Sequence, residues 1–267
     1  MGTDPFAAEG PVHRGSDPTG PEPGTLAGPP PADVAVPEAV RAVAGSAPLR
    51  PVWRNPLGGL TFAVDPEGPA PRFVKWAPAG AALDLAAEAA RLRWAAPIVT
   101  VPVPLAEGAD AEGSWLVTRA LPGTSAVSQR WSADPVTACR AIGAGLRTLH
   151  DALRVADCPF SWSVTDRIER AGIDPAVVGP APAIDQLVVC HGDPCAPNTL
   201  IGEDGRVTGH VDVGALGVAD RWADLAVATW STVWNFGAGH EHHVLAAYGI
   251  DPDPERTGFY RRLWAAT

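Results

Sequence analysis

The sequence has almost no lysine, and the single exception is informative. Of its 20 lysine and arginine residues, Lys75 alone is a lysine. Asparagine is also rare, and Asn198 is one of three in the chain. Because arginine serves equally well on a solvated surface, a residue type this scarce is expected where its own chemistry is needed. Lys75 and Asn198 are therefore candidate functional residues.

The sequence also lacks the patterns of secreted, zinc-binding and membrane-spanning chains. Its four cysteines show no C-x-x-C spacing and no histidine partner pattern, which indicates neither a disulfide framework nor a zinc site. They are Cys139, Cys158, Cys190 and Cys195. No basic segment precedes an apolar leader, and no run of about 18 apolar residues occurs. We expect a cytoplasmic monomer without a membrane span.

Positive charge is in short supply as well. The formal net charge is −10, with 30 acidic residues against 20 basic ones. This balance argues against nucleic acid or an anionic membrane as a partner, and it suits a cationic small molecule. The apolar fraction of 46% is ample for a core, and 267 residues are enough for one large domain or two lobes.

The most informative stretch surrounds the turn His191-Gly192-Asp193. Four apolar residues before it, Leu187 to Cys190, predict a short buried strand. Asn198 follows five positions after Asp193. The same step separates the aspartate and asparagine in the H-R-D-x-x-x-x-N catalytic loop of protein kinases.

A hairpin is predicted immediately after this turn. Its strands lie at 199–201 and 207–211, around a turn at 202–205. Asn198 precedes the first strand and Asp212 follows the second, so both side chains emerge at the open end of the hairpin. Together with the preceding aspartate, three oxygen-bearing side chains are gathered there.

Oxygen ligands without a histidine or cysteine pair suit a hard cation such as Mg²⁺, which leaves some positions to substrate phosphates. This chemistry indicates phosphoryl transfer. Asp212-Val213-Gly214 also stands where kinases have D-F-G. Each signal is weak alone, because H-G-D is a common tripeptide and Asp-x-Gly is usually a turn. In this order and structural context, they jointly favour a kinase.

The residues around this site resemble a known family. HGDPCAPN, followed by VDVGALGVADRWADLA, is similar to the aminoglycoside 3'-phosphotransferases, a family of antibiotic kinases; the similarity extends to CPFSWSVTDRIERA, AAYGI and FYRRL. The resemblance implies an α+β, bilobal protein-kinase-like fold, with a small β-rich N-lobe and a larger, mostly helical C-lobe. It also implies Mg²⁺-dependent transfer of the γ-phosphate of ATP to the 3'-hydroxyl of an aminoglycoside, which is an antibiotic-resistance reaction.

The resemblance also implies roles for individual residues. By this similarity, Asp193 orients and deprotonates the acceptor hydroxyl, while Asn198 and Asp212 hold magnesium. Asp220 and Asp224 match family positions that we take to support the catalytic loop.

The chain before this site divides into an extension and a lobe. Residues 1–36 are rich in Pro, Gly, Ala and Asp and have no apolar periodicity, which predicts a disordered N-terminal extension. Residues 37–120 are assigned to the N-lobe and 121–267 to the C-lobe. The first two strands of the N-lobe are predicted at 49–53 and 60–64.

Between these strands lie Gly58 and Gly59, which would let backbone N–H groups approach phosphates, although a Gly-Gly hairpin turn is commonplace. The serine that the resembled family tends to have in this loop is replaced by Leu57, which leaves phosphate contact to the backbone. A third strand at 72–76 carries Lys75, as the lysine strand of a kinase does.

A helix is predicted over 81–96, and Glu88 lies on its buried face. Helical spacing places four apolar residues on that face: Leu85, Ala89, Leu92 and Ala96. An ionised carboxylate there is costly without a partner. Lys75 is the natural partner, since kinases use such an ion pair to aim the lysine at the α- and β-phosphates. The alternative is a glutamate at the edge of the stripe that reaches solvent.

Two further strands are predicted, at 99–103 and 114–118, and Pro122-Gly123 then ends the sheet at a hinge between the lobes. The resemblance puts the adenine edge against the backbone of Arg119 and Leu121.

In the C-lobe a long helix is predicted from Asp134-Pro135, an N-cap followed by proline at the first helical position. Its apolar stripe consists of Ile142, Leu146, Leu149 and Leu153. His150 lies beside this stripe and is expected to be structural. His191 is expected to brace the catalytic loop rather than to move protons.

The sequence departs from the family where the acceptor would bind. Residues 171–186 hold a short proline-rich segment in place of a longer helical insertion, and the chain ends in Trp264-Ala265-Ala266-Thr267 instead of an acidic, aromatic tail. Five candidates for acceptor contacts remain, although a solvated surface charge is the better explanation of each: Asp166, Glu169, Asp174, Glu241 and the terminal carboxylate of Thr267.

The sequence leaves three functions open. The first is an aminoglycoside kinase, and the second is a kinase of another sugar-containing antibiotic or a small metabolite. The third is a nucleotide-binding module without turnover. It is disfavoured because five residues are all of the type that catalysis needs: Lys75, Glu88, Asp193, Asn198 and Asp212.

Overall fold

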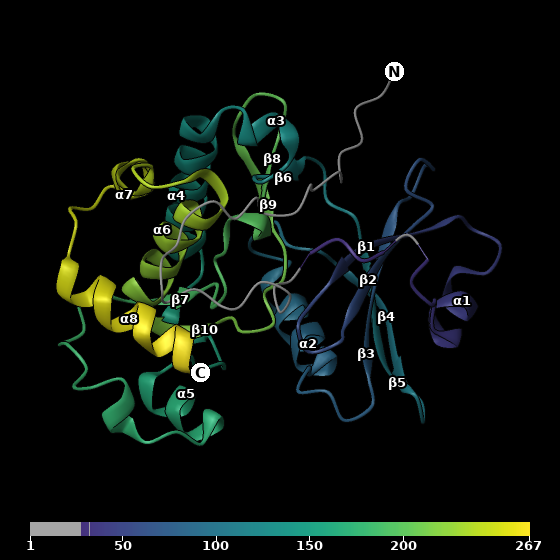
Figure 1. The fold of residues 1–267 in the computed structure, drawn as a ribbon, viewed down its shortest axis with the longest axis horizontal. Helices are drawn as coiled ribbons and strands as arrows, with labels where there is room; N and C mark the ends of the chain where they lie inside the picture. The colour runs from purple at the N-terminus through teal and green to yellow at the C-terminus, as the bar shows by residue number, and fades with distance from the viewer. Residues whose placement is uncertain (1–27, 32) are drawn as a thin grey trace.

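The computed structural model describes residues 28–31 and 33–267, and these form two lobes joined at the end of the first sheet (Figure 1). The first lobe is built on one antiparallel sheet and the second is mostly helical. Among the described residues, no helix is both long enough and apolar enough to cross a membrane.

Most of the predicted N-terminal extension, residues 1–27 and 32, lies outside the described residues. Gly28 forms an isolated bridge with Arg54. Val34 and Val36 pack against the core of the first lobe.

The sheet of the first lobe has five strands in the order β1-β2-β3-β5-β4. They are β1 (Leu49–Arg54), β2 (Leu60–Val64), β3 (Arg72–Pro78), β4 (Pro104–Ala109) and β5 (Gly113–Arg119). Side chains alternate between its two faces. Phe62, Val74 and Val117 are buried in one cluster with helix α1 (Glu38–Ala44). Their neighbours along the strands therefore face the other side.

Four of the five strand predictions in this lobe are confirmed, but the strand predicted at 99–103 is wrong. Pairing begins at Pro104 instead. Pro102 has no N–H to donate to a ladder. The carbonyl of Thr100 accepts from the His210 N–H at 3.0 Å, and that of Val103 accepts from the Arg119 N–H at 3.0 Å. The segment thus links the first lobe to the second.

Helix α2 (Leu85–Ala95) covers the second face of the sheet and lies between the sheet and the other lobe (Figure 1). It begins later than the predicted residue 81, because the Asp84 side chain caps it by accepting from the Ala87 N–H at 2.8 Å. The predicted stripe is buried except for Ala96, whose place Ala95 takes. Leu92 and its neighbours share one cluster with residues of the second lobe, so α2 connects the two cores.

The second lobe contains six α-helices and two small sheets among its described residues. Its helices are α3 (Gln129–Ser132), α4 (Pro135–Ala152), α5 (Val164–Ala171), α6 (Trp222–Phe236), α7 (Glu241–Tyr248) and α8 (Pro254–Ala266). Its strands are β6 (Thr124–Ser125), β7 (Leu187–Cys190), β8 (Thr199–Ile201), β9 (Val207–His210) and β10 (Gly217–Asp220). The sheets are β10-β7 and β6-β8-β9. The predicted strand before His191 and the predicted hairpin are both confirmed.

Helix α4 runs through the second lobe as predicted. Asp134 caps it by accepting from the Thr137 N–H at 3.2 Å, and proline occupies its first turn. All four predicted stripe residues are buried. Gly143 lets α7 approach, because a Cβ there would lie 2.1 Å from the carbonyl oxygen of Val244.

We expect Gly143→Ala to destabilise the protein by about 1–3 kcal/mol, since backbone atoms must move to admit the methyl group. The matched control is Gly258→Ala in α8, where the new Cβ would meet only the flexible Arg262 side chain at 3.4 Å. That change should be neutral, or stabilising by up to about 1 kcal/mol. Urea unfolding measures both. A Gly143→Ala variant that unfolds at the wild-type midpoint would contradict this packing.

Candidate active site

Lys75 lies between the lobes and is held by two carboxylates. Its Nζ donates to Glu88 Oε1 at 2.6 Å and to Asp212 Oδ1 at 2.8 Å. Val74 points toward α1, so Lys75, the next residue of β3, points toward α2. Glu88 occupies the buried face of α2. The predicted Lys75–Glu88 ion pair is confirmed.

The two carboxylates differ in their exposure. The side chain of Glu88 is 7% exposed and that of Asp212 is 47% exposed. Burial opposes the charge on Lys75, but Asp212 and Glu88 together outweigh it and raise its pKa above the ordinary value. Lys75 in turn lowers the pKa of Asp212. Glu88 is thus the fixed partner of the lysine, whereas Asp212 opens toward the cleft and is accessible to a ligand.

The hairpin β8–β9 places Asn198 and Asp212 beside one another, as predicted. The Val211 N–H donates to the Asn198 carbonyl at 2.9 Å, and both predicted side chains line the same cleft. Asp212 has φ of 61°, in the left-handed region that few residues other than glycine adopt. Such a conformation often marks a functional position.

Asp193 lies next to Asn198 in the loop that follows β7. The Asn198 Nδ2 donates to the Asp193 carbonyl at 2.9 Å and to its Oδ2 at 3.3 Å. The other oxygen, Oδ1, is buried and accepts no hydrogen bond from any described residue. Burial and the charge of Asp212 raise the pKa of Asp193, against opposing effects of Cys195 and His191.

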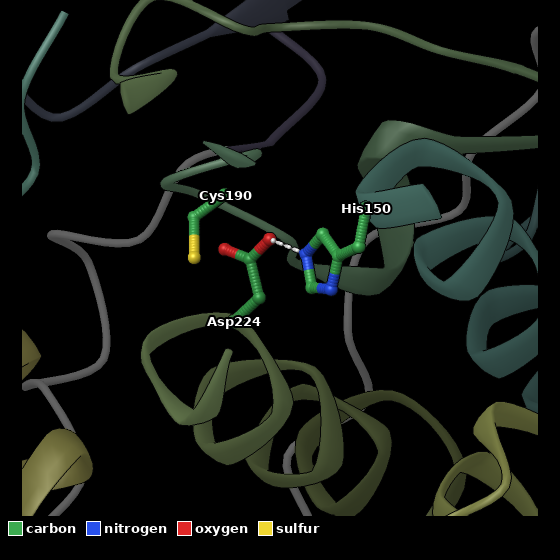
Figure 2. A group of neighbouring side chains, drawn as sticks. All are labelled: His150, Cys190 and Asp224. Carbon is green, nitrogen blue, oxygen red and sulfur yellow. Dashed lines mark hydrogen bonds and ion pairs between the residues drawn. The ribbon is translucent and has the colours of Figure 1, made fainter. Parts of the chain in front are cut away.

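Asp224 in α6 fixes this loop through hydrogen bonds to its backbone. It is fully buried, and its two oxygens accept from the N–H groups of His191 at 2.6 Å and Gly192 at 2.9 Å. His150 Nε2 is 2.9 Å from Asp224 Oδ2 (Figure 2), and His150 Nδ1 is 2.9 Å from the Tyr248 hydroxyl. Burial opposes ionisation of Asp224, but His150 and His191 lower its pKa. These bonds support the loop role that we predict for Asp224 and the structural role of His150.

His150, Cys190 and Asp224 form a compact buried group in which the possible metal-ligand atoms all lie within 4.8 Å of one another (Figure 2). Both oxygens of the carboxylate and both ring nitrogens are already hydrogen-bonded. The Cys190 thiol donates to the Asp220 carbonyl at 3.4 Å. We therefore interpret the group as a brace of the catalytic loop rather than as a metal site.

The other two predicted supporting residues are also bonded to segments around the loop. Asp220, at the end of β10, accepts from the N–H groups of Asp185 at 2.7 Å and Trp222 at 2.9 Å. It thereby ties the segment before β7 to the start of α6. His191 Nε2 lies 3.0 Å from the Val211 carbonyl, which joins the loop to the hairpin.

A cleft between the lobes encloses about 1110 Å³, part of it open to solvent. It is lined by six of the predicted site residues: Lys75, Glu88, Arg119, Leu121, Asn198 and Asp212. Trp53 and Phe73 line it from the first sheet, and Leu200 and Val211 from the hairpin. Apolar surfaces of this kind suit a flat aromatic ring between them. Sequence patterns did not single out these four apolar residues.

The turn between β1 and β2 is organised by Asn55, which sequence analysis missed. Its Oδ1 accepts from the N–H groups of Leu57 at 3.0 Å and Gly59 at 2.8 Å. The Gly58 N–H donates to the Asn55 carbonyl at 3.1 Å. The N–H groups predicted to approach phosphates are therefore bonded within the turn in this structure. The rarity of asparagine was the available signal.

Two of the acceptor candidates, Asp166 and Glu169, lie on α5 near the end of α8. Hydrogen bonds from Ser161 and Ser163 lower the pKa of Asp166. Thr267 Oγ1, in the residue that follows α8, accepts from Arg167 Nη2 at 2.6 Å.

The remaining candidates are engaged in local caps. Asp174 accepts from the Ala176 N–H at 2.9 Å, and Glu241 accepts from the Gly239 N–H at 2.8 Å. Helix α7, which Glu241 begins, packs on α4 on the side of the lobe away from α2 (Figure 1). None of the five acceptor candidates lines the cleft that holds Lys75.

Two residues that line the cleft fit the magnesium ion that the sequence implies. Asp212 is ionised and half exposed, and Asn198 bonds to Asp193 through its Nδ2, which leaves its oxygen for another partner. An all-oxygen set with a carboxylate and an amide suits Mg²⁺ when substrate phosphates complete the coordination.

The fold and this site define a class of protein: a two-lobed phosphotransferase with a lysine–glutamate pair in one lobe and an aspartate–asparagine loop in the other. Comparison with known families is more specific. The chain matches the model described as the phosphotransferase enzyme family over residues 57–177 and 176–260. The protein belongs to this family and is an enzyme that transfers phosphate to a hydroxyl group.

Three named relatives match most of the chain. An aminoglycoside 3'-phosphotransferase from Streptomyces fradiae is 35% identical over 220 residues, which are 70% of this chain and 81% of the relative. One from Streptomyces ribosidificus is 37% identical over 70% of this chain and 82% of the relative. A streptomycin 3''-kinase from Streptomyces griseus is 36% identical over 73% of this chain and 84% of the relative.

Solved structures agree with the observed fold. A type VIII aminoglycoside-3'-phosphotransferase superposes with a TM-score of 0.71 at 31% identity, over 86% of this chain and 97% of that one. An aminoglycoside phosphotransferase from Streptomyces rimosus, in complex with ADP and streptomycin, gives a TM-score of 0.66 at 28% identity, over 85% of this chain and 95% of that one. The predicted α+β, bilobal kinase-like fold is confirmed.

We expect Lys75→Arg to lower kcat/KM for ATP by at least about tenfold although the charge is kept, because a planar guanidinium cannot replace a compact ammonium between two carboxylates. Glu88→Gln should lower it as well, by freeing the lysine from its fixed partner. Arg72→Lys, in the same strand but outside the cleft, is the control and should behave as wild type. Steady-state kinetics with ATP as the varied substrate measure kcat/KM for all three variants. Wild-type values for both cleft variants would show that Lys75 has no nucleotide role.

Proposed function

We propose that the protein phosphorylates the 3'-hydroxyl of an aminoglycoside antibiotic with ATP and Mg²⁺, and so confers resistance. The observation that carries this proposal is the meeting of Lys75, Glu88 and Asp212 in one ion-paired group at the cleft. Relatives named aminoglycoside 3'-phosphotransferase, at 35% and 37% identity, support the choice of acceptor.

The residues of the cleft have distinct roles in this proposal. Lys75, aimed by Glu88, holds the phosphates of ATP, while the backbone at Arg119 and Leu121 meets the adenine edge. Asn198 and Asp212 hold Mg²⁺, which neutralises charge on the phosphate oxygens when it is bound. We keep 37–120 and 121–267 as the proposed limits of the two lobes, since β5 ends at Arg119.

Asp193 orients the acceptor hydroxyl and takes its proton as the oxygen attacks the γ-phosphorus, while the bond from that phosphorus to the β,γ-bridging oxygen breaks and ADP leaves. Its Oδ1 accepts no hydrogen bond from any described residue and so is left for the acceptor hydroxyl, which must displace the side chains that bury it. The loop that carries it is fixed by Asp224, so little reorganisation is needed on substrate binding.

The acceptor region supports a narrower substrate profile than the family resemblance implies. Of the five acceptor candidates, three are engaged by hydrogen bonds to neighbouring residues: Asp166, Asp174 and Glu241. Each charge-assisted hydrogen bond that a polycationic ligand lacks costs about 1.5–3 kcal/mol. We therefore propose weak binding, with kanamycin- and neomycin-type compounds as the best acceptors of the class.

A second candidate is phosphorylation of streptomycin. It is favoured by the 36% identical streptomycin 3''-kinase and by the streptomycin complex of the Streptomyces rimosus enzyme. A coupled ADP-release screen of the purified protein against kanamycin, neomycin, streptomycin and nucleoside antibiotics separates the candidates. Turnover of kanamycin or neomycin with the product phosphorylated at the 3'-position is expected. Turnover of streptomycin alone would promote the second candidate, and ADP release with none of them would contradict both.

Asp193→Ala should reduce kcat by about 10²–10⁴ while ATP affinity stays close to wild type, because a group that orients the acceptor acts in the transition state. Titration with a fluorescent ATP analogue measures the affinity, and the ADP assay measures turnover. Glu203→Ala, which removes an exposed carboxylate in the turn between β8 and β9, is the control. An Asp193→Ala enzyme with near-wild-type kcat would refute the assignment of Asp193. A wild-type protein that binds ATP but turns over no acceptor would be a nucleotide-binding module.

A further inference from the structure

Helix α5 carries an arginine on its inward face, close to the catalytic loop. Arg167 follows Val164 by three residues and precedes Ile168, and both of these apolar residues pack against the core of the second lobe. Arg167 itself is partly buried. A partly buried arginine on this face needs hydrogen-bond acceptors for its guanidinium, or must extend the guanidinium to the surface.

The guanidinium of Arg167 contacts the same side chain that anchors the catalytic loop. Its Cζ lies 4.7 Å from the centroid of the Trp162 ring. The Trp162 indole N–H donates to the Gly192 carbonyl at 3.1 Å, and Gly192 directly precedes Asp193. Arg167 is thus one indole ring away from the residue that we assign to the acceptor hydroxyl.

No carboxylate neutralises Arg167 at close range. Its Nε and Nη2 donate to the Thr267 hydroxyl at 2.9 and 2.6 Å, and among the described residues it forms no ion pair within 4.0 Å. Burial and the neighbouring charge of Arg170 lower its pKa, while the charge of Asp193 raises it. The guanidinium remains charged near neutral pH, since arginine starts from a very high pKa.

The acidic residue nearest along α5 does not cancel this charge. Ser161 and Ser163 hold Asp166 by hydrogen bonds, and the charge of Arg170 also lowers its pKa. Asp166 and Arg170 thereby offset one another on the outer part of the helix. Arg167 is left as the net positive charge on the side that faces Trp162 and the loop.

We propose that Arg167 determines acceptor specificity, by disfavouring molecules that carry an ammonium group next to the hydroxyl to be phosphorylated and favouring a neutral polar group there. This inference rests on the proposed function. A like charge in a partly desolvated site repels over several ångströms, and repulsion of the wrong ligand is an established route to specificity. Arg167 therefore places one cation next to the indole that holds the catalytic loop, in a protein that is otherwise acidic.

Kanamycin A and kanamycin B test the proposal, because they differ only at the carbon next to the 3'-hydroxyl, which bears a hydroxyl in the first and an amino group in the second. The readout is the ratio of kcat/KM for kanamycin A to that for kanamycin B. We expect Arg167→Gln to lower this ratio by about fivefold, as expected for one charge pair across a partly solvated gap. Arg167→Lys should keep it, because the charge remains. Arg170→Gln, in the next turn of α5, is the control and should keep it too.

Loss of folded protein cancels in the ratio, because both acceptors are measured on the same preparation. If the wild type turns over both kanamycins and Arg167→Gln leaves the ratio unchanged, the inference is overturned while the proposed function stands. If Arg167→Lys lowers the ratio as much as Arg167→Gln does, the effect comes from the shape of the guanidinium and the charge account is overturned. An equal fall in Arg170→Gln would assign it to the general charge of α5. A wild type that turns over neither kanamycin would overturn the proposed function and, with it, this inference.

Discussion

The ion-paired group of Lys75, Glu88 and Asp212 is the interaction on which the arrangement of the two lobes depends. A lysine removed from water needs close carboxylates, and here it has one from each lobe. Glu88 can pair with Lys75 only if α2 packs on the sheet, and Asp212 can pair with it only if the hairpin β8–β9 reaches the cleft. The apolar cluster that α2 shares with Leu149, Val189 and Val213 makes this alignment stable, because it fuses the cores of both lobes behind the charged group.

The second lobe contributes a rigid platform for the reacting groups. The loop with Asp193 is held by backbone bonds to Asp224, by the Trp162 indole and by the bond between His191 and Val211. These contacts come from α6, from the segment before α5 and from the hairpin, so the loop is fixed on three sides. Groups that are fixed before substrate arrives lose less free energy to reorganisation during the reaction. The half-exposed Asp212, in contrast, is placed to exchange its contact with Lys75 for a ligand.

Local patterns in the sequence were sufficient for much of this site. The alternation of β3 and the helical stripe of α2 placed Lys75 and Glu88 on facing surfaces, and the hairpin turn placed Asn198 and Asp212 together. The predictions that were wrong or missing depend on distant contacts. The segment at 99–103 is apolar like a strand, but its carbonyls bond to other parts of the chain. The bonds of His150 to Asp224 and of Arg167 to Thr267 leave no periodic signal, because each is made by one polar side chain whose partner depends on the tertiary fold. Asn55 is the exception: its bonds are local to its own turn, but a single side chain leaves no periodic signal either.

The scarcity of lysine makes the central claim directly measurable. Since Lys75 is the single lysine of the chain, protein labelled with ¹³C at lysine Cε gives one lysine resonance, which reports on this group alone. The account predicts that a non-hydrolysable ATP analogue with Mg²⁺ shifts this resonance strongly and saturably, as the ammonium exchanges its contact with Asp212 for phosphate oxygens. A lysine resonance that stays unchanged while the nucleotide demonstrably binds would contradict the placement of Lys75 at the phosphates.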